Sequence, residues 1–171
     1  MTVMLTDTIR LFLFPALMAF AAFSDLFTMT ISNRISLLLV AGFFVMAARV
    51  GLSGAQILSH IGAGSAVLLI TFTLFACGWI GGGDAKLAAA TALWIGFDPL
   101  MNYLVYSSLI GGALTLAILR YRHIPMPALL ESQDWAARLH RADSGVPYGI
   151  ALAAGALAVY PQTVWMRPLG L

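Results

Sequence analysis

Long apolar runs, separated by short polar or glycine-rich breaks, fill most of this sequence. A helix needs about 20 consecutive, mostly apolar residues to cross the hydrocarbon core of a bilayer. The runs therefore predict six membrane-spanning helices, over residues 5–24, 35–50, 55–80, 87–97, 101–119 and 147–164. The second and fourth runs are short and need flanking residues in order to span. The fold class that follows is an all-α, polytopic integral membrane protein.

Composition supports this class and excludes others. Of the 171 residues, 61% are hydrophobic and only 9% are charged, whereas a soluble domain carries roughly 25% charged residues. The length predicts a single domain over residues 1–171. The net charge is only +2, so nucleic acid is not an expected partner. The single cysteine, Cys77, excludes an intramolecular disulfide and a cysteine-based zinc cluster, and is expected to be a buried packing thiol.

The positive charges predict how the chain is oriented in the bilayer, because Lys and Arg gather in cytoplasmic loops. If the first helix runs inward, the inner side collects Arg34, Lys86, Arg120, Arg122, Arg138 and Arg141. The outer side then holds Arg10, Arg49 and Arg167. This asymmetry predicts that both termini lie outside.

The segment 120–145 is the one substantial polar stretch, and it is predicted to be a cytoplasmic loop. Its apolar residues Leu129, Leu130, Trp135 and Leu139 recur at near-helical spacing among charged neighbours. Two interpretations are open: an amphipathic helix that lies on the inner membrane surface, or a solvated loop that only connects two helices.

Two aspartates stand at the edges of apolar runs on the predicted cytoplasmic side. Asp25 follows the first run, and Asp84 precedes the fourth. An ionisable residue at such a position is costly unless it has a task or a partner, although capping a helix is an ordinary reason for either aspartate alone. Two carboxylates brought together in a bundle can share one proton, which provides the acid and the base of aspartic proteases.

Three consecutive glycines, residues 81–83, come directly before Asp84. Glycine allows close approach of backbone that a side chain would forbid, and irregular backbone at membrane depth is tolerated beside protein or a water-filled cavity. The glycines therefore predict a break where water and an extended peptide reach Asp84. A flexible turn between two helices is the alternative.

These residues together resemble the type IV prepilin peptidase family, which are membrane aspartic proteases. The family's Gly-x-Gly-Asp-x-Lys pattern is matched by Gly81, Gly83, Asp84 and Lys86. The family's first aspartate opens a segment with an Ile-x-Asn-like ending, matched by Asp25, Ile31 and Asn33. The Pro-Tyr-Gly of residues 147–149 is similar to that of short members that serve Flp-type (tight-adherence) pili.

The chain departs from the family pattern in two places. Basic residues often follow the family's first aspartate, whereas Phe27, Thr28 and Met29 stand here. The long cytoplasmic loop with paired cysteines, found in larger members, is absent. The zinc site and the N-methyltransferase activity of those members are therefore not implied.

The resemblance implies an endopeptidase of the bacterial cytoplasmic (inner) membrane, which removes the leader peptide of prepilins or pilin-like precursors at the cytoplasmic face. Asp25 and Asp84 would be the catalytic pair. The residues that would contact the substrate are Gly81, Gly83, Lys86 and Asn33. For Lys86, a positive-inside anchor is an alternative role. No metal or other cofactor is implied, and the partners are the precursor, the lipid bilayer and the pilus assembly machinery.

Two other functions fit the same residues. A small proton- or cation-coupled transporter would also place aspartates within the membrane. A structural subunit of a membrane assembly would need neither aspartate.

Overall fold

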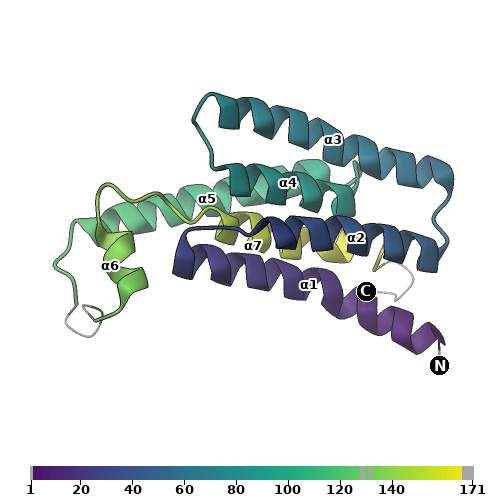
Figure 1. The fold of residues 1–171 in the computed structure, drawn as a ribbon, viewed down its shortest axis with the longest axis horizontal. Coiled ribbons are helices and arrows are strands. Elements are labelled where there is room, and N and C mark those ends of the chain that lie inside the picture. Colours follow the sequence, from purple (N-terminus) through teal and green to yellow (C-terminus); the bar gives the residue numbers. More distant parts are fainter. Residues whose placement is uncertain (1, 128–129, 131, 167–171) are drawn as a thin grey trace.

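The computed structural model describes residues 2–127, 130 and 132–166, which contain helices and no strand (Figure 1). In chain order the elements are α1 (Thr2–Thr28), α2 (Asn33–Val50), α3 (Gly54–Ala76), α4 (Gly82–Ile95), α5 (Leu100–Arg122), α6 (Asp134–His140), α7 (Gly149–Val159) and the 3₁₀ helix η2 (Tyr160–Gln162). The all-α class predicted from the sequence is confirmed.

Four of the described helices, α1, α2, α3 and α5, are long and apolar enough to cross a membrane, judged by length and composition. The helix α4 has 14 residues, and α7 with η2 forms a shorter apolar helix, Gly149–Gln162. Each of the six predicted runs is thus helical, and the protein is polytopic. The helices α4 and α7 with η2 are shorter than the roughly 20 residues that span a bilayer, so their polar ends must be covered by neighbouring helices.

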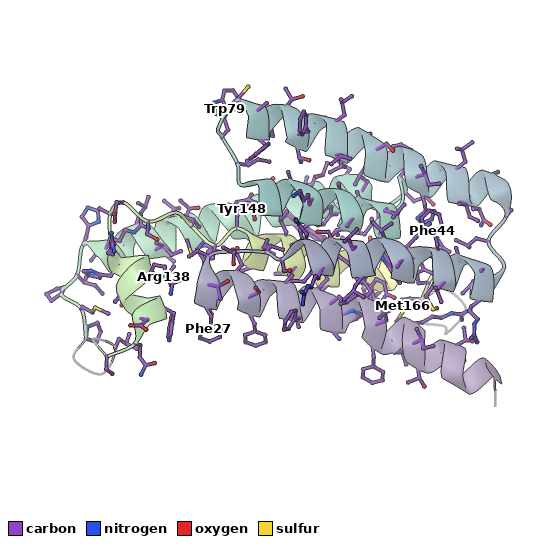
Figure 2. The ribbon with its side chains drawn as sticks, viewed as in Figure 1. Phe27, Phe44, Trp79, Arg138, Tyr148 and Met166 are labelled. Carbon is purple, nitrogen blue, oxygen red and sulfur yellow. The ribbon has the colours of Figure 1, made fainter. Side chains whose placement is uncertain are left out.

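Large apolar side chains cover the outside of the bundle. Phe27 and Trp79 project outward in Figure 2, and they are 46% and 76% exposed. A soluble protein would rarely expose so many apolar side chains. This surface is instead suited to contact lipid.

Consecutive helices of the bundle run in opposite directions (Figure 1). The connections at residues 29–32 and 77–81, together with the long segment 123–148, lie at one end, which we call the loop end. The connections at residues 51–53 and 96–99 lie at the opposite end, where α1 begins and α7 ends. Alternating directions place the last turn of α1 and the first turns of α4 and α7 at the same end.

The short helix α4 lies inside the bundle. Every residue of α4 from Leu87 to Ile95 is buried, and its Ala-rich sequence allows neighbouring helices to approach closely. Its far end is held by indole hydrogen bonds: Trp94 Nε1 donates to the Leu39 carbonyl at 2.7 Å, and Trp165 Nε1 donates to the Trp94 carbonyl at 2.6 Å. The position of α4 along the bundle axis is therefore well determined.

Several boundaries differ from those predicted. Helix α1 continues to Thr28, so Asp25 lies within its last turns and not after it. Helix α3 ends at Ala76, and α4 begins at Gly82, so the break covers residues 77–81 and two of the three consecutive glycines are helical. Cys77 is exposed in this break, and the prediction of a buried thiol is wrong because α3 ends before it.

The segment after α5 folds back onto the bundle. Arg122 donates to the carbonyls of Leu139 (2.9 Å), Ser144 (2.8 Å) and Gly145 (3.0 Å). The Trp135 ring of α6 meets the Phe27 ring of α1 edge-on, with centroids 5.9 Å apart. Residues 134–140 of this segment thus form the short helix α6. Its location on the inner membrane surface stays a prediction. Leu129 lies outside the described residues.

Candidate active site

Asp25 is held at the loop end by the last short helix. Its side chain is 5% exposed, and its Oδ2 accepts a hydrogen bond of 2.7 Å from the backbone N–H of Gly149, the first residue of α7. The first N–H groups of a helix have no partner within the helix and favour a negative charge. Gly149 therefore gives Asp25 a well-matched partner inside the bundle.

Asp84 lies in the first turn of α4, where it is partly buried. Gly81 is the residue that caps this helix. A β-carbon added to Gly81 would lie 3.0 Å from Asp84 Oδ2. The ordinary role of an acidic residue at a helix N-terminus therefore applies to Asp84, and a glycine at position 81 leaves room for it.

The two carboxylates come near each other although 59 positions separate them in the numbering. Asp25 is bound by Gly149, and Ile31 packs against both Gly149 and Gly83, the residue before Asp84. Two like charges held near each other in a setting of low dielectric constant are unfavourable, so such a pair favours the form that holds one proton. One carboxyl group can then donate a proton while the other accepts one, which is the capacity needed for acid–base catalysis on a peptide.

Ile31 links the two sides of the candidate site. A β-carbon added to Gly83 would lie 3.2 Å from Ile31 Cβ, and one added to Gly149 would lie 2.7 Å from Ile31 Cδ1. The extended segment before α2 therefore passes between the start of α4 and the start of α7. Gly83 thus allows the start of α4 to pack closely against Ile31.

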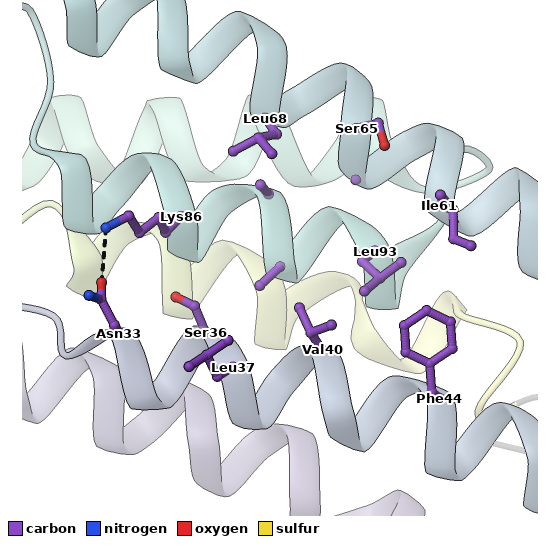
Figure 3. A pocket seen from close by; sticks show the side chains of 13 residues that line it. Asn33, Ser36, Leu37, Val40, Phe44, Ile61, Ser65, Leu68, Lys86 and Leu93 are labelled. Atoms are coloured by element: carbon purple, nitrogen blue, oxygen red, sulfur yellow. Dashed lines mark hydrogen bonds between the residues drawn. The ribbon is translucent and has the colours of Figure 1, made fainter.

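Lys86 and Asn33 pair with each other and not with the aspartates. Lys86 Nζ donates a hydrogen bond of 2.9 Å to Asn33 Oδ1 (Figure 3). Neither ion pair found among the residues that the structure describes involves Lys86. Two residues turn a helix by about 200°, so Lys86 and Asp84 point to different sides of α4.

The Lys86–Asn33 pair stands at the loop end of a groove between α2, α3 and α4. The groove has a volume of about 580 Å³. Its lining is mostly apolar or small and includes Gly64, Ser65, Ala89, Ala90, Leu37, Val40, Phe44, Ile61, Leu68 and Leu93 (Figure 3). Of the six residues predicted to form the site, the structure thus gathers Asp25, Asp84, Gly81 and Gly83 on one side of α4, and Lys86 with Asn33 on another.

Gly149 is the contact that the sequence prediction missed as a site residue. The Pro-Tyr-Gly of residues 147–149 is a visible signal, because a glycine that opens a helix two residues after a proline is suited to close approach. No cluster of three or more His, Cys, Asp or Glu side chains that could hold a metal ion occurs within the described ranges.

Comparison with models of protein families finds a match over residues 12–116 to the type IV leader peptidase family. The matched region includes Asp25 and Asp84, and it ends before Gly149. No curated protein matches the chain. No solved structure matches it.

Proposed function

Because the chain belongs to the type IV leader peptidase family, we propose that it is an aspartic endopeptidase that cleaves the leader peptide from type IV prepilins, of the Flp type, or from pilin-like precursors. The observation that carries the proposal is the placement of Asp25 and Asp84 at the loop end of the bundle, where Ile31 packs against both Gly149, which binds Asp25, and Gly83, which precedes Asp84. The family supports a peptidase in the membrane, and this pair is its candidate for the catalytic group.

In the proposed reaction the two carboxyl groups hold one proton between them. The ionised carboxylate takes a proton from water as the water attacks the carbonyl carbon of the scissile peptide bond. The protonated carboxyl group donates its hydrogen bond to the carbonyl oxygen. When the tetrahedral intermediate collapses, the C–N bond breaks, the leaving nitrogen receives a proton, and the shared proton of the pair is restored.

The neighbouring residues have proposed roles in binding the precursor. Gly81 and Gly83 keep the approach to Asp84 free of side chains, so that an extended peptide backbone can reach it. Lys86 and Asn33 present a cationic donor and an amide at the surface near the start of α4, where they would hydrogen-bond the precursor. The cleaved bond would then lie at the membrane boundary.

The predicted orientation completes the proposal. Both termini lie outside, and the loop end with both aspartates faces the cytoplasm of a bacterial cell, whose inner membrane holds the protein. The precursor's leader would stay inside while its apolar helix lies in the bilayer. The pilus assembly machinery is a candidate partner on this view.

The proposal is tested by expressing the chain together with a candidate prepilin and reading the precursor's size by immunoblot. Asp25→Asn and Asp84→Asn should each abolish cleavage while the protein remains in the membrane, since one neutral amide removes the acid–base pair. Asp143→Asn is the control, because Asp143 is exposed and pairs with Arg141 at 2.7 Å. Full cleavage by either site variant would reject the assignment of that aspartate.

A further inference from the structure

The contact between Gly149 and Asp25 is closer than any side chain at position 149 would allow. A β-carbon there would lie 2.8 Å from Asp25 Oδ2, 3.1 Å from Asp25 Cβ and 2.7 Å from Ile31 Cδ1. The hydrogen bond from the Gly149 N–H to Oδ2 is itself short, at 2.7 Å, and buried. The space for this hydrogen bond exists only because residue 149 is glycine.

Backbone conformation does not explain the glycine. The described glycines with a left-handed φ are Gly51, Gly78 and Gly96, and Gly149 is not among them. Any residue could adopt its backbone angles. The requirement at position 149 is therefore for space beside the carboxylate.

The N–H of Gly149 is fixed in place by the packing of α7 against α5. The Tyr148 hydroxyl donates to the Ser107 carbonyl at 3.3 Å, and the Tyr148 ring fills the space in front of Gly111. Seven residues after Tyr148, about two helical turns further on, Gly155 leaves room for the Ser107 side chain. Helix α5 therefore determines where the donor to Asp25 lies.

We propose that Gly149 is a positioning residue of the active site, whose N–H holds one oxygen of Asp25 so that the other oxygen faces Asp84 and the attacking water. This inference rests on the proposed function. With Oδ2 occupied by the Gly149 donor, Oδ1 is the oxygen that exchanges protons. A methyl group at position 149 pushes the carboxylate away from this orientation while leaving the N–H in the chain.

The test compares Gly149→Ala, Ile31→Val and the double variant. Kinetic constants for prepilin cleavage are measured in liposomes, per molecule of folded enzyme. Gly149→Ala should lower kcat by about 10- to 100-fold with KM within a factor of about two, because a displaced catalytic group costs rate and not binding. Ile31→Val removes Cδ1 only, and it should cleave at close to the wild-type rate.

The double variant separates positioning from packing. It removes the contact of the new methyl group with Ile31 Cδ1 and keeps its contact with Asp25 Oδ2. If Gly149 acts through Asp25, the double variant stays as slow as Gly149→Ala. If its kcat returns to that of Ile31→Val, Gly149 serves only to pack against Ile31, and the inference is overturned. The double variant carries less steric strain than Gly149→Ala. If Gly149→Ala does not accumulate in the membrane, the kcat of the double variant is therefore compared with that of Ile31→Val alone.

Two further variants complete the design. Gly112→Ala is the matched control, because a β-carbon at Gly112 would meet nothing within 4 Å, and its kinetic constants should equal those of the wild type. Asp25→Asn, assayed in parallel, reports on the proposed function itself. If Asp25→Asn still cleaves, the proposed function fails; if it does not cleave but the double variant does so at the wild-type rate, only the positioning role fails.

Discussion

Gly83 of α4 lies directly against Ile31: a β-carbon on Gly83 would come within 3.2 Å of Ile31 Cβ and 3.5 Å of the backbone N and O of Ile31. The backbone at Gly83 is not left-handed, so space is again the constraint. Gly83→Val should therefore lower the cleavage rate severely, since a branched side chain meets backbone that cannot rotate away. Gly83→Ala needs Ile31 to shift by only a few tenths of an ångström, and its loss should be intermediate.

The measurement for both Gly83 variants is prepilin processing against a fixed amount of folded enzyme. Gly112→Val serves as the control on α5, where the added side chain faces open space. A wild-type rate per molecule for Gly83→Val would show that the glycine run is an ordinary connection between helices.

The two aspartates should act as one unit in kinetics. Removal of either carboxyl group leaves the other without its proton partner, so Asp25→Asn, Asp84→Asn and the double variant should share the same residual rate. Single-turnover cleavage assays with purified enzyme can compare the three. If the double variant is much slower than either single variant, the losses add and the groups act independently.

The Lys86–Asn33 pair should matter for binding more than for rate. Lys86→Ala should raise KM about threefold to tenfold, consistent with the net contribution of one hydrogen bond at an exposed position, and leave kcat nearly unchanged, because the pair does not contact the aspartates. Lys86→Arg retains the charge and should recover part of the loss. If Lys86 is only a positive-inside anchor, Lys86→Ala leaves KM unchanged and lowers the amount of correctly inserted protein.

The helical order of the fold was predictable because long apolar runs must be helical in a bilayer. The placement of Asp25 and Asp84 at one end followed from counting these runs. The pairing of Lys86 with Asn33 was not predicted, because the two residues are 53 positions apart and only tertiary packing brings them together. Once α4 begins at Gly82, helical geometry alone turns Lys86 away from Asp84.

The hydrogen bond between Gly149 and Asp25 could not be derived from local pattern. The two residues are 124 positions apart, and Gly149 with Ala153 also fits the small-residue spacing typical of helix packing. A small residue on a membrane helix is needed wherever anything approaches closely, whether a helix or a carboxylate. Only the tertiary packing of α7 against α1 shows that the glycine at position 149 leaves space for a carboxylate as well as for a helix.

The predicted orientation can be tested with reporter fusions. A reporter placed after Arg122 or after Arg141 should be active on the cytoplasmic side, and one placed at Leu171 should be active outside. The physical reason is the excess of Lys and Arg at the loop end. A cytoplasmic C-terminus would mean either an odd number of spans or, with six spans, an inverted bundle that places both aspartates on the outer face.

Arg122, at the end of α5, holds the segment that leads from α6 to the start of α7, where the donor to Asp25 lies. Its guanidinium donates to three backbone carbonyls, the last of which belongs to Gly145, two residues before Pro147. Arg122→Ala removes all three donors, each worth about 1.5–3 kcal/mol when the donor is charged. Amide hydrogen exchange over residues 134–146 should therefore become faster, while the core of α4 stays protected.

Arg122→Ala should also have a smaller effect on Asp25. The Gly149 N–H that donates to Asp25 lies only four residues after Gly145, whose carbonyl Arg122 binds. The cleavage rate of Arg122→Ala should fall severalfold, and Arg122→Lys should not restore it, since one ammonium cannot reproduce a planar guanidinium that serves carbonyls in different directions. Arg120→Ala is the control for loss of positive charge at the same end of α5, where Arg120 is exposed. Unchanged exchange over residues 134–146 in Arg122→Ala would show that α6 is held by its contacts with α1, such as Trp135 against Phe27, and that Arg122 contributes little.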